Sequence, residues 1–386
     1  MLDTAQHKLG EIRTDLRRQV LEQDEVIDLL LVAFLMRDHI AIVGPHGEGK
    51  TYLAERFARY MDGGYFYHLL TRYTVPDELI GHYSLAALQR DEFKRRTDGR
   101  ACDARTVCLD EVFKANSPTL NALLGLMNER RVDGVDAKLC TLIGISNEFP
   151  RGIESRDRLG DDESLLPLWD RFVVRVELRP PTSDDTFERI VRNSLPQPTA
   201  PALTTDEVDA LHARVAELQA ELPDAVLDTF LSMRQRLAGE GISVSSRRWY
   251  KASCAVCAHA LLHGRERATR GDCRVLRHVL WEQPEHRSKV SDIVLECASP
   301  ETAVALAIEA AVLRSVHDYH AHHMSEGADK SYARDRLLAD VRAHLHELQD
   351  VADDPDTSDT DEVKRVLGVL RTVGDVLKRE IMEILS

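Results

Sequence analysis

Short apolar runs alternate with amphipathic stretches through the first half of the chain. Residues 39–43 and 104–109 are apolar runs, and each is followed by a stretch with apolar residues at helical spacing. A short apolar run bounded by turn residues indicates a buried strand, and 3-4 spacing indicates a helix packed on it. The pattern therefore predicts an α/β fold, with strands over 39–43, 65–70, 104–109, 137–145 and 172–178.

The second half of the chain is predicted to be helical, because residues 204–298 carry apolar positions at 3-4 spacing. A proline-containing linker over 196–201 separates this region from the strands. An acidic stretch over 350–362 has the composition of a loop without regular structure, and a final apolar stripe follows it. The predicted domains are a core over 1–195, a helical region over 202–298 and a helical extension over 300–386.

Composition narrows the class of protein. The net charge of −15 argues against a nucleic-acid binder, which normally carries a basic face. No apolar run approaches the roughly 20 residues that cross a bilayer, and the first residues lack the apolar segment of a signal peptide. We therefore expect a cytoplasmic protein without a membrane segment, whose seven scattered cysteines are free thiols.

A phosphate-binding loop follows the first apolar run. Gly44, Gly49, Lys50 and Thr51 fill the pattern G-x-x-x-x-G-K-[ST] between a predicted strand and a predicted helix. Glycines let the backbone wrap a phosphate, and the helix directs its positive dipole end at the same place. Lys50 is expected to reach the β- and γ-phosphates of ATP, and Thr51 to bind Mg²⁺. The predicted nucleotide contacts in this loop are Gly44, Pro45, His46, Gly47, Glu48, Gly49, Lys50, Thr51 and Tyr52.

Asp110 and Glu111 come directly after the apolar run 104–109. Two adjacent carboxylates at the end of a buried strand are costly unless a cation lies nearby. Mg²⁺ bound with ATP is such a cation: Asp110 is expected to hold its water shell and Glu111 to orient the attacking water. Asn147 ends the next predicted strand and is a candidate for positioning that water or for sensing the γ-phosphate.

Three arginines are candidates for contacting phosphate from elsewhere in the chain. Arg171 precedes the last predicted strand, so it cannot easily reach its own phosphate site and is expected to serve that of a neighbouring subunit. Arg247 and Arg248 stand in the first turn of a helix that Ser245 or Ser246 can cap. Arginines at a helix start oppose the helix dipole, which indicates an expected anion; two solvated arginines are the alternative.

Other features leave two interpretations open. The polar run 22–25 either borders an adenine pocket, through Gln23, or is a solvated turn. Cys254 and Cys257 have the spacing of a redox or zinc pair, but an apolar helix without a second pair favours core packing. The histidines over 317–323 lack the rigid i, i+4 pair with a carboxylate that strong metal motifs have, so metal binding stays an alternative.

In this order, the motifs resemble those of an AAA+ ATPase, and more closely those of the MoxR family and its RavA-like subgroup. The resemblance implies an αβα core with a five-stranded parallel sheet, a helical lid and a helical C-terminal extension. It rests on EQDEVIDLLLVAFLMRDHIAIVGPHGEGKT, LTRYTVPDELIGHYSL, CLDEVFKANSPTLNALLGLMNERRVDG, GISNE, LWDRFVVRVEL and SSRRW.

The resemblance also implies roles for the residues that match the family's motifs. His46 and Glu48 depart from the pattern, since the family usually has proline and a small residue there. The stretch 89–100 matches the helix-2 insertion of this clade, although such a charged run is usually only a solvated loop. The implied roles are Walker A for Lys50 and Thr51, Walker B for Asp110 and Glu111, sensor 1 for Asn147, the arginine finger for Arg171, and sensor 2 for Arg247 or Arg248.

The function that the resemblance implies is Mg²⁺-dependent ATP hydrolysis at the subunit interfaces of a ring, usually a hexamer. Such rings remodel or activate partner proteins in a chaperone-like manner, and the implied partner is a von Willebrand factor A domain protein or another protein client. A different class of function is a nucleotide-gated protein-binding module with little turnover. The intact Asp110-Glu111 pair disfavours that alternative.

Overall fold

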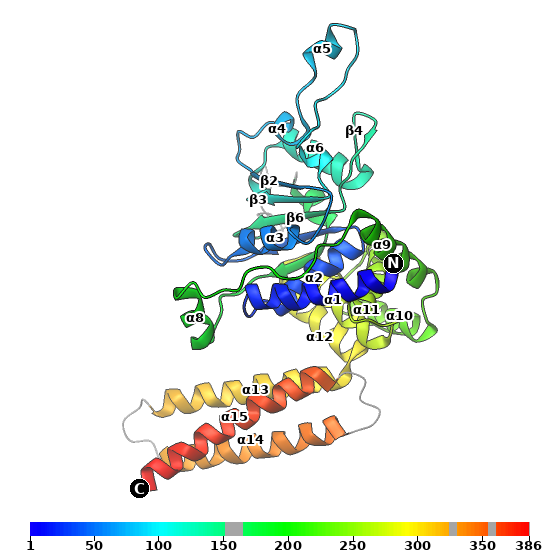
Figure 1. Ribbon diagram of the computed structural model, residues 1–386. Helices are drawn as coiled ribbons and strands as arrows, with labels where there is room; N and C mark the ends of the chain where they lie inside the picture. The colour runs from blue at the N-terminus through cyan, green and yellow to red at the C-terminus, as the bar shows by residue number, and fades with distance from the viewer. Residues whose placement is uncertain (151–164, 324–329, 354–359, 386) are drawn as a thin grey trace. The chain divides into compact units, whose positions relative to one another are not determined.

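The computed structural model describes residues 1–150, 165–323, 330–353 and 360–385, and it contains a five-stranded parallel sheet formed by strands between residues 39 and 177 (Figure 1). Its strand order is β2-β3-β6-β1-β7, so β1 lies between β6 and β7. The predicted α/β fold with a helical lid and C-terminal helices is confirmed. The strands are β1 (His39–Val43), β2 (Tyr65–Leu69), β3 (Thr106–Asp110), β6 (Thr141–Ser146) and β7 (Phe172–Glu177).

The inner strands are buried because each has a strand on both sides. Ile40 of β1 pairs with Ile143 of β6 and with Val174 of β7. Helix α2 packs on β1 and β7, and helix α3 packs on β3 and β6. The two edge strands differ: β7 is buried except at its last residue, whereas Tyr67 and Leu69 of β2 are exposed. Continuous apolar runs in the sequence therefore mark the strands whose two faces are covered.

The chain forms two compact units, residues 1–227 with 241–290 and residues 228–240 with 291–386. In the first unit α9 packs on α1, and α11 packs on α2 and α9. The predicted division into core, lid and extension stays a prediction. Helices of the first unit are α1 (Leu2–Gln19), α2 (Asp24–Leu35), α3 (Lys50–Ala58), α4 (Pro76–Ile80), α5 (Leu85–Leu88), η1 (Ala101–Asp103), η2 (Val112–Lys114), α6 (Ser117–Glu129), α7 (Leu166–Arg171), α8 (Asp184–Val191), α9 (Thr205–Ala220), α11 (Ser246–Leu262), η4 (Arg270–His278) and η5 (Pro284–His286).

The second unit is built around α13 (Pro300–His323), α14 (Lys330–Asp353) and α15 (Thr360–Leu385), with α10 (Asp224–Gly239) and α12 (Arg287–Ala298) shared between the units. The final apolar stripe packs within this unit. None of the helices in the described ranges combines the length and apolar character needed to cross a bilayer. The core includes Ala305, Ile308, Val312, Leu337, Val341, Leu348, Val363, Val366 and Leu370.

Some local expectations differ from the structure. Ser117 followed by Pro118 predicts a serine cap, but Asn116 caps α6: its side-chain oxygen accepts from the Thr119 amide at 3.0 Å, because Ser117 is already helical. The pair Asp133-Gly134 predicts a turn, and the structure adds a hairpin around it, formed by β4 (Arg131–Val132) and β5 (Val135–Asp136). The predicted acidic loop over 350–362 is helical at both ends, since α14 extends to Asp353 and α15 begins at Thr360; residues 354–359 lie outside the described ranges.

The two open metal interpretations gain no support. Among the described residues, no group of three or more His, Cys, Asp or Glu side chains is placed to hold a metal ion. Side chains of the histidine cluster from position 320 onward lie outside that description. Cys254 and Cys257 are free thiols, and burial raises the pKa of Cys257 to about 12. A neutral buried thiol packs as a small apolar side chain.

We expect Gly144→Ala to destabilise the fold by about 1–3 kcal/mol, because the core has no room for another methyl group. A Cβ on Gly144 would lie 2.4 Å from the ring of Phe172. The control is Gly125→Ala in α6, where a Cβ meets nothing within 4 Å and the free energy of unfolding should rise by up to ~1 kcal/mol. Urea unfolding measures both; equal stability of the two variants would contradict the packing.

Candidate nucleotide site

The loop between β1 and α3 has the backbone that the motif requires. Gly47 and Gly49 have φ of 85° and 76°, a left-handed conformation that disfavours other residues. A Cβ on Gly44 would come within 2.5 Å of the Leu178 carbonyl oxygen. Pro45 and His46 are exposed beside this turn, as is Gly47, whereas Glu48 is half-buried. Tyr52 lies in the first turn of α3, with the Arg56 guanidinium 4.6 Å from its ring centre.

Lys50 is buried at the start of α3, with 6% of its surface exposed. Its Nζ donates to the carbonyl oxygens of Gly44 at 2.7 Å and Pro45 at 2.6 Å, and to Asn147 Oδ1 at 2.9 Å. Burial lowers the pKa of the ammonium group, an effect that Asp110, Glu111 and Glu48 oppose. The ammonium group is thus held among oxygen acceptors, which anionic phosphate oxygens can replace.

Asp110 and Thr51 meet at the carboxyl end of β3. The Thr51 hydroxyl donates to Asp110 Oδ2 at 3.1 Å, and Tyr67 from β2 approaches the same oxygen at 3.3 Å. Burial and the adjacent carboxylate raise the pKa of Tyr67 to about 12, so the phenol stays a neutral donor. A hydroxyl and one carboxylate fit Mg²⁺, which usually takes few protein oxygens in addition to phosphates and waters. The sequence motifs did not indicate Tyr67. It joins the site because β2 pairs with β3 in the sheet.

Glu111 is the next residue and has left-handed backbone, with φ of 52°. Its Oε1 accepts from Asn147 Nδ2 and lies 3.1 Å from Lys114 Nζ. Asn147 therefore joins Lys50 to Glu111 through the two ends of one amide. Lys114 is a further residue that the sequence motifs did not indicate, and it reaches Glu111 because η2 turns the chain back.

Arg171 lies at the other edge of the sheet, immediately before β7. Its Nη1 donates to the Pro167 carbonyl at 3.3 Å and lies 3.5 Å from Asp170. Burial, with the nearby positive charge of Arg247, lowers the pKa of the Arg171 guanidinium. The structure thus groups Arg171 with Arg247 and separates both from Lys50.

The structure distinguishes the two lid arginines. Arg248 is 3% exposed, and its guanidinium donates to the carbonyl oxygens of Val279 and Asp170 and to the Asp170 carboxylate at 2.9 Å. Although burial opposes it, the bond to Arg248 lowers the pKa of Asp170. Arg247 is half-exposed and donates to Asn128 at 3.1 Å. Arg247 is therefore the arginine that stays accessible to an anion.

Gln23 is buried at the start of α2, where its amide donates to the Arg179 carbonyl at 2.7 Å. Two residues on, Glu25 bonds to Arg277 and His278 of η4. These groups lower the pKa of Glu25 against the opposing effect of burial. Gln23 thus lies between the end of β7 and the lid, a placement compatible with the predicted adenine contact.

One edge of the parallel sheet carries a phosphate loop, a carboxylate pair and a polar strand end, and the chain also has a helical lid. This combination defines an AAA+-type nucleotide-binding protein. A family model described as the MoxR domain in the MoxR-vWA-beta-propeller ternary systems matches residues 7–219, and an AAA lid domain model matches residues 225–294. The chain belongs to the MoxR family of AAA+ ATPases.

Similar proteins extend this picture. The uncharacterised protein MJ0812 of Methanocaldococcus jannaschii is 33% identical over 77% of this chain and 78% of its own length. Chaperone MoxR1 of Mycobacterium tuberculosis is 27% identical over half of each chain. A crystal structure of a candidate ATPase from Cytophaga hutchinsonii covers 76% of this chain and 94% of its own, with a TM-score of 0.58 and 18% identity. That structure shows a shared fold.

Replacement of the two lid arginines should differ in its effect on stability. Arg248→Ala removes a buried guanidinium and leaves the carbonyl oxygens of Val279 and Asp170 without this donor, so it should lower the free energy of unfolding by about 1–3 kcal/mol. Arg247→Ala removes only exposed contacts and should change it by no more than about 0.5 kcal/mol. Urea unfolding of the two variants measures the difference; a larger loss in Arg247→Ala would contradict the assignment.

Proposed function

We propose that this chain is a Mg²⁺-dependent ATP hydrolase whose active sites are completed between subunits of a ring. The observation that carries the proposal is the bonded set Thr51–Asp110 and Lys50–Asn147–Glu111 at the carboxyl edge of the sheet. Lys50 would bind the β- and γ-phosphates, and Glu111 would accept a proton from the attacking water. Asn147 would position that water relative to Lys50 and Glu111. Mg²⁺, held by Thr51 and Asp110, would supply charge neutralisation at the phosphates.

The proposal includes a ring because Arg171 and Arg247 lie at the amino ends of the strands, whereas the phosphate loop of the same copy lies at the carboxyl ends. A strand of five or six residues spans roughly 16–20 Å, which separates Arg171 and Arg247 from Lys50 within one copy. A neighbouring copy would bring Arg171 to the γ-phosphate, where it would neutralise charge that develops during transfer. Arg247 would contact the same phosphates as sensor 2, as part of the same interface.

We further propose that ATP turnover drives remodelling or activation of a partner protein. The description of the matching family model names vWA and β-propeller components, which supports a von Willebrand factor A domain protein as partner. The relative named as a chaperone supports the same kind of function. A hexamer and membership of the RavA-like subgroup belong to this proposal.

Glu111→Gln should retain ATP binding and lower steady-state turnover by about 10²–10⁴-fold, because the amide cannot accept the proton. Nucleotide binding by calorimetry and phosphate release measure the two properties separately. Glu55→Gln, an exposed change on α3, is the control and should keep the parent's rate. Parental turnover in Glu111→Gln would refute the role assigned to Glu111. No turnover in the parent would favour the nucleotide-gated binding module.

Arg171→Ala should lower turnover by about 10³–10⁵-fold, with ATP binding to the subunit's own loop retained. Mixing this variant with Lys50→Ala should restore part of the activity, since each supplies what the other lacks at a shared interface. Arg192→Ala on α8, where Arg192 pairs with Glu188 on the surface, is the control. If mixing restores no ATP turnover, the assignment of Arg171 to the site of a neighbouring subunit is wrong.

A further inference from the structure

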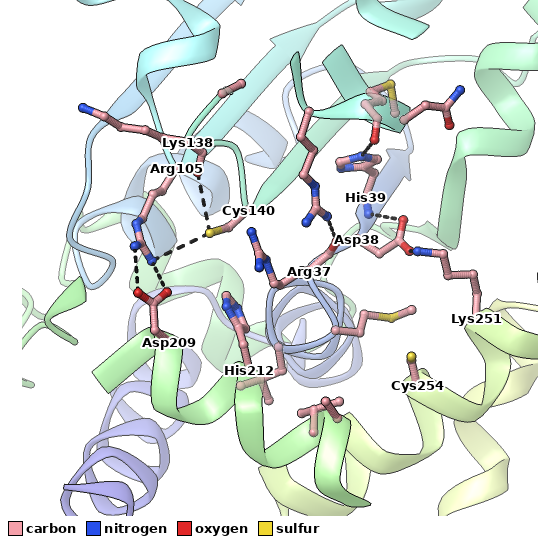
Figure 2. A pocket seen from close by; sticks show the side chains of 18 of the residues that line it. Arg37, Asp38, His39, Arg105, Lys138, Cys140, Asp209, His212, Lys251 and Cys254 are labelled. Carbon is pink, nitrogen blue, oxygen red and sulfur yellow. Dashed lines mark hydrogen bonds and ion pairs between the residues drawn. The ribbon is translucent and has the colours of Figure 1, made fainter. Parts of the chain in front are cut away.

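A cavity lies at the amino edge of the sheet, away from the phosphate loop, and Arg171 and Arg247 are among the residues that line it. Its volume is about 1340 Å³, and residues that precede β1, β3, β6 and β7 line it. Seven arginine and lysine side chains line the cavity, against four aspartate and glutamate side chains. This excess of positive charge stands in a chain with a net charge of −15. The cavity is therefore a local basic site on an acidic protein (Figure 2).

Several of these cations are neutralised by neighbouring carboxylates. Arg105 forms two bonds to Asp209, at 3.0 and 3.3 Å. Lys138 pairs with Asp103 at 2.7 Å, and Lys251 pairs with Asp38 at 2.6 Å. Figure 2 shows the Arg105 and Lys251 pairs at the sides of the cavity. These side chains need no further anion.

Neither Arg37 nor Arg130 forms an ion pair with a carboxylate within the described part of the chain. The Arg130 guanidinium donates to the backbone carbonyl of Arg37, and it lies close enough to the Arg37 side chain for the two charges to interact. In Figure 2 the Arg37 side chain points into the cavity, beside Cys140. Both arginines have left-handed backbone, with φ of 51° and 50°, a conformation that non-glycine residues rarely adopt.

The charges of these two groups work against each other. Burial lowers the pKa of the Arg130 guanidinium, and the positive charge of Arg37 lowers it further, against the smaller opposing effect of Asp38. Arg105, Arg37 and Arg130 are all close enough to Cys140 to oppose the effect of burial on its pKa. Like charges held together on strained backbone gain stability when an anion binds between them. Strain of this kind at unpaired charges is typical of binding sites.

We infer that Arg37 and Arg130 form a second oxyanion site, which takes the phosphate groups of a polyphosphate ligand. The planar guanidinium group binds phosphate through paired N–H donors, and two such groups can hold adjacent phosphates. The cavity is larger than the 300–1,000 Å³ that is typical of small-ligand sites, so a whole nucleotide fits. Two sources supply this chemistry: a free polyphosphate, or the nucleotide on a neighbouring copy. Only the second source rests on the proposed function.

The free-ligand source is tested by measuring pyrophosphate binding to the full chain with the substitution Lys50→Met. This substitution removes the positive charge of Lys50 from the phosphate loop. Calorimetry should detect pyrophosphate binding that weakens at least tenfold when Arg37→Gln or Arg130→Gln is added. The control is Arg267→Gln, an exposed change outside the cavity lining, which should bind as the Lys50→Met parent does.

The neighbour source is tested by the ATP turnover of Arg37→Gln in a chain that keeps Lys50, alone and mixed with Lys50→Met. If the nucleotide of a neighbouring copy is the ligand, Lys50→Met binds no pyrophosphate. Arg37→Gln then lowers ATP turnover at least tenfold, and mixing the Arg37→Gln protein with the Lys50→Met protein restores activity. Unchanged pyrophosphate binding together with unchanged turnover in Arg37→Gln overturns the site. A parent chain without turnover refutes the proposed ATPase but leaves the pyrophosphate comparison valid.

Stability separates a binding role from a structural one. Arg37→Gln and Arg130→Gln remove like charges and no ion pair within the described chain, so their urea midpoints should equal or exceed that of the parent. A lowered midpoint in both variants would assign the arginines to folding and overturn the inference. If the ligand is a free polyphosphate, added pyrophosphate should raise the midpoint of the Lys50→Met protein but not that of its Arg37→Gln version.

Discussion

The common direction of the five strands is the constraint on which the rest of the structure depends. Because β1 lies between β6 and β7 and all strands are parallel, every carboxyl end reaches one edge and every amino end reaches the other. Lys50, Asp110 and Asn147 follow strand ends and therefore meet. Arg37 and Arg171 precede strand starts and therefore lie away from them. One fold thus carries an edge with a carboxylate pair and an edge rich in basic side chains, which face opposite directions.

A buried arginine in the last strand links the lid to this arrangement. Arg175 of β7 is 1% exposed, lies 4.6 Å from the Trp169 ring centre, and donates to the carbonyl oxygens of Trp169 and Trp281. Burial lowers the pKa of this guanidinium well below its usual value. Arg248 ties α11 to Asp170 in the same region. The lid is therefore fastened at the amino edge, which explains why Arg247 lies beside Arg171.

Local chemistry explains which parts of the fold were predictable. The buried strands appear in the sequence as continuous apolar runs, since both of their faces are covered. A helix start is harder to predict where two neighbouring residues can both cap the helix. Asn116 and Ser117 can both cap α6, and the backbone geometry selects Asn116. The β4–β5 hairpin has only two residues in each strand, too few for a periodic pattern.

The sequence by itself determined the phosphate loop, because the turn, the lysine and the helix start are contiguous and their geometry is a property of the local backbone. It also indicated the carboxylates and Asn147, since each ends an apolar run. Only the tertiary structure decided that Arg248 is buried while Arg247 is accessible, and that Arg37 and Arg130 share a cavity. Those positions are 93 residues apart in the chain and belong to no motif, so only packing around the sheet could bring them together.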